Sequence, residues 1–267
     1  MLIDYHVHTD TSIDARATLK EYCEKAKQLG VNEFCVTNHH ELFSVDNETY
    51  DYALNEENIV SLKRDIEIMK QKYNLQIKFG VELGYYEGRE KELFDFIKKN
   101  EFDYVLGSVH LLDGVMITSK QVLDADKSEL IKRYKRYFQL LKQAIELRFF
   151  DCVAHFELPR KEMPQLVFNE YKDDAAECIV AMKKNNVGFE LNTGGWRRVQ
   201  REAYPRKEIL SMLYEAGIRN VTLGSDCHGT EELGYGINQG LKLLEGVGFK
   251  EFCTFDKRKP CFKKIIL

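Results

Sequence analysis

The sequence contains neither a long apolar segment nor a secretory signal. No run of about 18 apolar residues occurs, so no transmembrane helix is expected. The N-terminal MLIDYHVH lacks the basic start and the apolar run of a signal peptide. The seven cysteines are odd in number and form no CxxC pair, as in proteins whose thiols stay reduced. We therefore expect a cytoplasmic protein that does not contact a membrane.

Two further absences concern charge and phosphate binding. The formal net charge is -4, without the basic excess that nucleic-acid-binding proteins usually carry. No GxxxxGK[ST] loop occurs, which argues against nucleotide transfer. The 44% hydrophobic and 31% charged residues are ordinary for a globular protein. We expect a small-molecule partner and no nucleic acid; the sequence indicates no particular oligomeric state.

Short apolar runs alternate with longer amphipathic stretches along the chain. Runs rich in Val, Ile, Phe and Tyr predict buried strands at Leu2–Val7, Glu33–Thr37, Gln76–Glu82, Asp103–Val109, Cys152–His155, Gly188–Asn192 and Val221–Ser225. Amphipathic stretches predict helices at Leu19–Leu29, about Glu56–Tyr73, Glu90–Lys99, Ser128–Leu147, Glu170–Asn185 and Lys207–Ala216. Thr18 and Glu21 form a capping box before the first helix, and Gly30 follows its end.

This alternation predicts an α/β fold with parallel strands and right-handed crossovers. An open doubly wound sheet and a closed barrel both satisfy the pattern. No linker or low-complexity segment divides the chain, so we predict a single domain over residues 1–267. The tail Cys253–Leu267 is expected to form an edge strand or a packed extension.

Residues that bind metals follow the predicted strands. They lie at or just beyond the carboxyl ends of these strands and are His6, His8, His39, Glu82, His110, His155, Asp226 and His228. His6 and His8 are alternate residues of one strand, so their rings share a face. The carboxyl ends of barrel strands converge on one mouth, where active sites lie, whereas an open sheet would spread them along an edge. The clustering therefore favours the barrel.

The chemistry of these side chains is also uniform. Imidazoles and carboxylates suit Zn²⁺, Mn²⁺ or Fe²⁺, and thiolates are missing because strand alternation points Cys227 away from its neighbours Asp226 and His228. A single ion with about four ligands would leave half of the set unused. We therefore predict two to three divalent metal ions.

Over nearly its full length the chain resembles the polymerase and histidinol phosphatase (PHP) superfamily of phosphoesterases. The segments that carry the resemblance are DYHVHTDTSID, TNHH, GSVH and GSDCH. The resemblance implies a distorted (β/α)7 barrel and adds Asp14 as a ninth metal ligand. Two positions depart from the family pattern. Asn38 replaces a common aspartate that is not a ligand, and Asp14 replaces a histidine, a change that would favour a harder ion.

The resemblance also implies how three ions share these ligands. The first ion would be held by His6, His8, Glu82 and Asp226, the second by Glu82, His110 and His155, and the third by Asp14, His39 and His228. Glu82 would bridge two ions, and a hydroxide held between them would be the nucleophile at neutral pH. Glu82 and Asp226 are therefore predicted to be catalytic.

Two arginine-bearing segments, HFELPRK and ELNTGGWRR, resemble the histidinol-phosphatase branch of the family. Their Arg160 and Arg197 are predicted to be catalytic and to bind substrate, because a guanidinium grips phosphate through a planar fork. Arg198 competes with Arg197 for this role. His40 is either a substrate contact or a loop residue outside the ligand set. The expected reaction is hydrolysis of L-histidinol phosphate to L-histidinol and phosphate in histidine biosynthesis.

Three other functions fit part of the pattern. An amidohydrolase-like enzyme also has HxH on its first strand, but it would need a bridging lysine where Glu82 stands. A PHP nuclease would normally accompany a polymerase and would need a basic groove. A metal-binding or regulatory protein without activity would be expected to have lost ligands, and none is missing.

Overall fold

The computed structural model describes residues 1–42, 53–117, 125–161 and 166–267. Its main sheet has eight strands, seven of which follow the order β1-β2-β4-β5-β8-β9-β10 in parallel pairs. Their bounds are β1 Leu2–Val7, β2 Val31–Val36, β4 Gln76–Gly84, β5 Tyr104–Ser108, β8 Cys152–Val153, β9 Gly188–Asn192 and β10 Val221–Gly224. The short β3, His39–His40, pairs with β4 beyond the end of β2.

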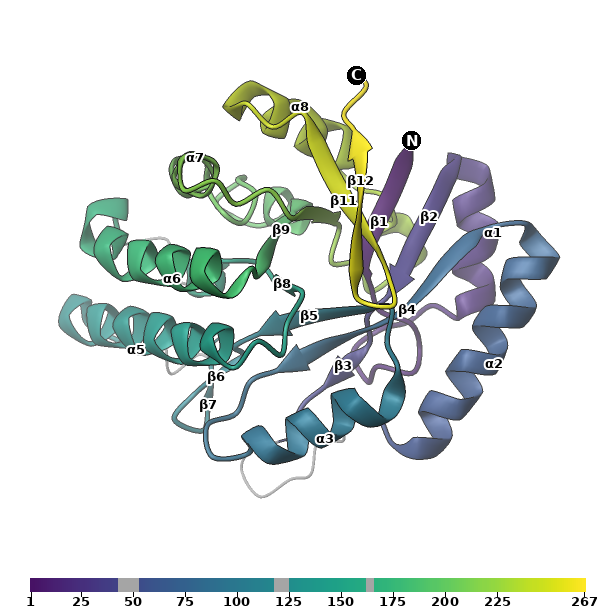
Figure 1. Cartoon of the computed structure of the whole chain (residues 1–267), viewed down its shortest axis with the longest axis horizontal. Coiled ribbons are helices and arrows are strands. Elements are labelled where there is room, and N and C mark those ends of the chain that lie inside the picture. The colour runs from purple at the N-terminus through teal and green to yellow at the C-terminus, as the bar shows by residue number, and fades with distance from the viewer. Residues whose placement is uncertain (43–52, 118–124, 162–165) are drawn as a thin grey trace.

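The first and last strands of this order meet and nearly close the sheet into a barrel. Val7 and Cys227 form a parallel bridge. The backbone N–H of His8 donates to the carbonyl of Cys227 at 3.0 Å, and the N–H of Cys227 donates to the carbonyl of His6 at 3.2 Å. Figure 1 shows the helices arranged around the strands. The predicted barrel is therefore confirmed, and the open sheet is wrong.

Helices connect the strands and pack their apolar faces on the barrel. They are α1 Leu19–Leu29, α2 Glu56–Tyr73, α3 Glu90–Asn100, α5 Lys127–Glu146, α6 Lys172–Asn185, α7 Lys207–Glu215 and α8 Ile237–Val247. The predicted capping box of α1 forms: Thr18 Oγ1 accepts from the N–H of Glu21 at 3.2 Å, and the Glu21 carboxylate accepts from the N–H of Thr18 at 2.8 Å. Within the described residues, no helix combines the length and apolarity needed to cross a membrane.

Other elements differ from the predicted ranges. β8 ends at Val153, two residues before the predicted end, because His155 has a backbone φ of +24° that a strand does not allow. α6 begins at Lys172, since Phe168–Glu170 form a 3₁₀ turn. α8 was not predicted; its glycines weaken the helical pattern, yet its apolar face is buried.

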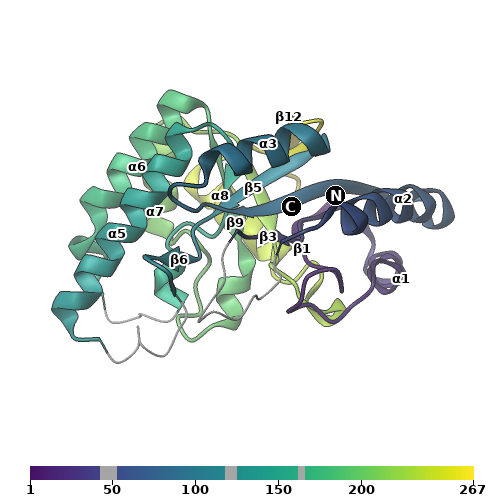
Figure 2. The same cartoon turned by 90° about the horizontal axis from the view of Figure 1, so that it is seen from below.

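The C-terminal tail is a packed extension, one of the two forms expected for it. β11, Glu251–Asp256, and β12, Lys259–Lys264, form an antiparallel hairpin in front of the strands in Figure 1. Phe255 is buried, its ring lies 4.9 Å from that of Tyr104, and its N–H donates to the Tyr5 hydroxyl at 2.9 Å. In Figure 2 the hairpin and β6, Leu111–Leu112, which follows His110, lie on opposite sides of the strands. The hairpin therefore covers the end of the barrel opposite the predicted metal site.

Candidate metal centre

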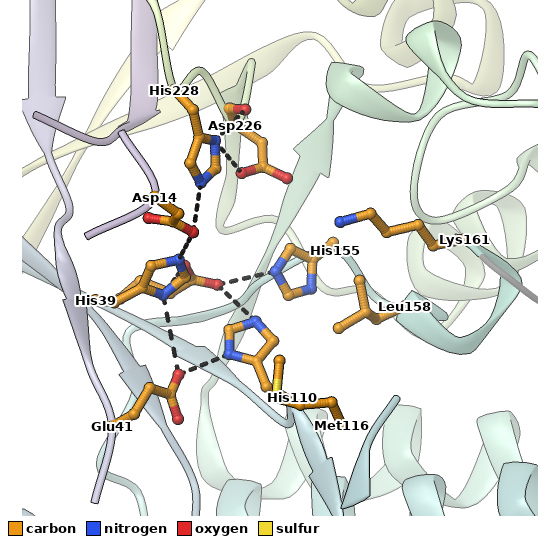
Figure 3. Close-up of a pocket in the computed structure, with 11 residues that line it drawn as sticks. Asp14, His39, Glu41, His110, Met116, His155, Leu158, Lys161, Asp226 and His228 are labelled. Atoms are coloured by element: carbon orange, nitrogen blue, oxygen red, sulfur yellow. Dashed lines mark hydrogen bonds and ion pairs between the residues drawn. The ribbon is translucent and has the colours of Figure 1, made fainter. Parts of the chain in front are cut away.

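The nine predicted metal ligands come together at the carboxyl ends of the strands, and Figure 3 draws those that line a cavity there. Seven of them line a cavity of about 220 Å³: Asp14, His39, Glu82, His110, His155, Asp226 and His228. His6 and His8 are fully buried and contact the Glu82 carboxylate beneath this cavity. The remaining lining residues are Glu41, Met116, Leu158 and Lys161. Segments separated by more than 200 residues in the sequence thus form one site, because parallel strands end together at the mouth of a barrel.

Glu82 divides its two carboxylate oxygens between separate groups of imidazoles. Oε1 lies 3.3 Å from His110 Nε2 and 2.9 Å from His155 Nε2. Oε2 lies 3.2 Å from His6 Nε2 and 3.5 Å from His8 Nε2. Burial disfavours the charged carboxylate, but the surrounding histidines outweigh it and hold the pKa of Glu82 well below its usual range. An ionised carboxylate in this position is suited to bridging two cations.

The two aspartates approach the remaining rings. Asp226 Oδ1 lies 3.6 Å from His6 Nε2 and 3.7 Å from His228 Nδ1. Asp14 Oδ2 lies 3.4 Å from His39 Nε2 and 3.3 Å from His228 Nε2. Asp226 has a backbone φ of +54°, a conformation that costs a non-glycine residue of order 1–3 kcal/mol and is found preferentially at functional sites.

The side chains fit divalent metal ions. The ring atoms His6 Nε2 and His8 Nε2 are buried without a hydrogen-bond partner among the described residues, which is costly unless an ion binds them. Ligands about 2.1 Å from a tetrahedral ion lie roughly 3.4 Å from one another, close to the separations observed here. Groups whose ligand atoms all lie within 4.8 Å of one another are His6, His8 and Glu82; Glu82, His110 and His155; His8, His39 and His228; and His39, Glu41 and His110.

Glu190 belongs to this site, although it is not among the residues predicted from the sequence. Its Oε1 lies 2.7 Å from His6 Nδ1, and its Oε2 accepts from the N–H of His155 at 2.9 Å. Burial opposes protonation of His6, but the Glu190 and Glu82 carboxylates raise the pKa of this ring well above its usual value. Binding at Nδ1 fixes the ring so that Nε2 faces the Glu82 carboxylate. The available sequence signal was a glutamate within the apolar run GFELN.

Glu41 is the second residue that the sequence analysis missed. It lines the cavity, and its Oε1 lies 2.6 Å from His110 Nδ1. Burial lowers the tendency of His110 to protonate, but Glu41 and Glu82 together raise the pKa of this ring to about 9. The carboxylate fits because a Cβ added at Gly84 would lie 1.6 Å from Glu41 Oε2. Its sequence signal was its position two residues after His39.

The predicted substrate residues do not line the cavity. Arg160 is 2% exposed, and its guanidinium pairs with Glu157 at 3.2 Å and with Glu202. Arg197 Nη2 donates to the carbonyls of Ser225 and Asp226, each at 2.9 Å, and so anchors the loop that carries Asp226.

His40 and Arg198 also lie outside the cavity lining. His40 stacks on Phe96 with ring centroids 3.5 Å apart, and burial lowers its pKa to about 4. Arg198 is exposed. Substrate contacts by Arg160, Arg197 and His40 stay predictions, and those by the two arginines would require the guanidinium groups to leave these partners.

Comparisons with known proteins agree with this architecture. Residues 4–194 match the PHP domain family. A probable histidinol-phosphatase of Deinococcus radiodurans is 28% identical over 266 residues, covering 97% of this chain and 98% of the relative. The histidinol-phosphatase of Lactococcus lactis is 24% identical over 275 residues, covering 98% and 99%. The crystal structure of histidinol phosphate phosphatase from Lactococcus lactis, complexed with zinc, L-histidinol and phosphate, matches with a TM-score of 0.84 at 22% identity. It covers 97% of this chain and 98% of that one.

Substitution Glu82→Gln is expected to lower both metal content and turnover by orders of magnitude, because the neutral amide cannot bridge two cations. Metal analysis after purification with Mn²⁺ or Zn²⁺ measures the first effect. Glu33→Gln is the control, since Glu33 is also buried but contacts Tyr5 and lies outside the cavity lining. Normal metal content and turnover in Glu82→Gln would contradict the bridging role.

His110→Asn is expected to reduce activity far more than His40→Asn. His110 presents Nε2 to Glu82 in the cavity, whereas His40 packs against Phe96 away from it. Kinetics of both variants, with thermal melting to correct for lost stability, make the comparison. Equal losses of activity at matched folded fractions would mean that the ligand assignment is wrong.

Glu190→Gln is expected to weaken metal affinity by about 10–100-fold, the usual effect of losing a carboxylate that orients a ligating histidine. The amide keeps the shape of the side chain, but it no longer offers a charged acceptor to His6 Nδ1. Titration of the metal-free variant with Zn²⁺ measures the change. Affinity equal to that of the unmodified protein would show that His6 needs no such support.

Proposed function

The chain belongs to the PHP domain family, and on this basis we propose that it is a metal-dependent phosphomonoesterase that hydrolyses L-histidinol phosphate to L-histidinol and phosphate. Relatives named as histidinol phosphatases match it over nearly their whole length. The solved relative of similar fold holds zinc, L-histidinol and phosphate together. Because of this substrate, we also propose that the protein acts in histidine biosynthesis, in the cytoplasm.

The position of the Glu82 carboxylate is the observation that carries this proposal. Its two oxygens face different imidazoles: Oε1 faces His110 and His155, and Oε2 faces His6, His8 and His39. This arrangement supports two divalent ions that share one ligand. Asp14, with its Oδ2 near both His39 and His228, supports a third ion. Zn²⁺, Mn²⁺ and Fe²⁺ all suit such nitrogen and oxygen ligands.

Bound divalent ions would supply positive charge for the phosphate oxygens and a water activated for attack. The residues of the chain hold the ligand rings in place. Glu190 and Glu41 fix the rings of His6 and His110 through their Nδ1 atoms, and Arg197 anchors the Asp226 loop. These contacts keep the ligands in position before substrate arrives, which reduces the cost of reorganisation during the reaction.

The cavity also supports a small substrate. Its volume of about 220 Å³ is below the roughly 300–1,000 Å³ of sites for drug-sized ligands. The apolar side chains of Met116 and Leu158 line it together with the acids and imidazoles. A phosphate group beside the ligands and a compact carbon skeleton beside the apolar side chains would satisfy both parts of this lining.

L-Histidinol phosphate is expected to show the highest kcat/KM in a panel of phosphate monoesters. Removal of metal with a chelator should abolish turnover, and added Mn²⁺ or Zn²⁺ should restore it, because the proposed hydrolysis needs a water activated by a divalent ion. Released phosphate is the measurement.

The Glu82→Gln variant, purified in parallel, reports any contaminating phosphatase. Turnover that survives both chelation and this substitution would not come from the proposed site. Hydrolysis of amides or of DNA, without hydrolysis of phosphate monoesters, would replace the proposal with a different hydrolase.

A further inference from the structure

The segment after β8 turns one cationic side chain toward the cavity and another away from it. Leu158–Lys161 form a 3₁₀ helix, in which residues three apart lie on the same face. Leu158 and Lys161 both line the cavity, as this spacing requires. Arg160 lies on a different face, where its guanidinium pairs with Glu157 and Glu202. Of the two cationic residues in HFELPRK, the one that lines the cavity is therefore Lys161.

The environment of Lys161 is unusual for a lysine. Of the described residues that line the cavity, it is the one lysine or arginine, and four others are carboxylic acids. Its side chain is half-buried, yet no residue in the described part of the chain forms an ion pair with it. Figure 3 shows the ammonium end pointing toward the space beside His155 and Asp226. An ammonium held in this way is available to an anionic ligand in the cavity.

We propose that Lys161 binds the phosphoryl group of the substrate, on the side of the group that faces away from the metal ligands. The proposal rests on the proposed phosphomonoesterase function and deepens it. Lys161 supplies a compact positive charge with three donors, where an arginine would supply a planar fork. Leu158, on the same face of the 3₁₀ helix, places an apolar surface next to this charge. The substrate is thus an ester whose phosphate contacts Lys161 and whose carbon skeleton packs against Leu158 and Met116.

The test compares Lys161→Met and Lys161→Arg with the unmodified protein, each loaded with Zn²⁺ or Mn²⁺. Inorganic phosphate is the probe, and calorimetry gives its dissociation constant without turnover. Lys161→Met should raise this constant by about 10–100-fold, the loss expected for one charge-assisted hydrogen bond. Lys161→Arg should recover part of the loss. Metal content and melting temperature should not change, because Lys161 is not a predicted metal ligand and is not part of the hydrophobic core.

Lys172→Met is the matched control, since Lys172 is exposed at the start of α6 and does not line the cavity. It should bind phosphate as the unmodified protein does. Steady-state kinetics should show kcat/KM of Lys161→Met lowered by a factor similar to that for phosphate binding.

Three results would overturn either the Lys161 assignment or the proposed phosphomonoesterase function on which it rests. If Lys161→Met binds phosphate normally while the unmodified protein hydrolyses phosphate esters, the lysine contact is wrong and the function stands. A fall in metal content in Lys161→Met would also overturn the phosphate contact. If the unmodified protein hydrolyses no phosphate ester but Lys161→Met still loses phosphate binding, the function is wrong and the anion site stands.

Discussion

The interaction on which the site depends is the burial of one carboxylate among several imidazoles. Glu82 is 1% exposed at the end of β4, and an isolated charge at that depth would be costly. The rings of His6, His8, His39, His110 and His155 surround it, and their ring nitrogens lie within 3.5 Å of its oxygens. The carboxylate and the imidazoles lower the free-energy cost of burying one another, and bound cations would neutralise the remaining negative charge. The site therefore forms as a unit.

Space for the outer carboxylates is provided by glycine. A Cβ added at Gly224 would lie 2.1 Å from Glu190 Oε1, and one added at Gly84 would overlap the Glu41 carboxylate. Both glycines lie at the ends of strands that carry or precede ligands. Any larger residue there would displace the carboxylate that fixes a histidine ring. The backbone of the barrel thus determines ring orientation as much as the side chains do.

Sequence reasoning succeeded where a local signal decides the structure. The capping box and Gly30 delimit α1, and the placement of histidines after apolar runs indicated both the barrel and its mouth. It did not identify Glu190 and Glu41, because their roles depend on which ring lies across the barrel. It named Arg160 as a phosphate contact by residue type and did not consider Lys161. The direction of each side chain is decided by the 3₁₀ turn and by Glu157 and Glu202, which no local pattern reveals.

The contact between β1 and β10 determines when the candidate metal centre can form during folding. The predicted ligands extend from His6 to His228. The histidines of the first strand therefore lack some of the other predicted ligands until the last strand of the barrel has paired with it. During synthesis the centre is absent until nearly the whole barrel has emerged, and contacts of such long sequence separation form slowly. Ions that bind only the finished barrel would then stabilise it by mass action. Metal supply in the cell would thus act on the yield of folded protein as well as on its chemistry.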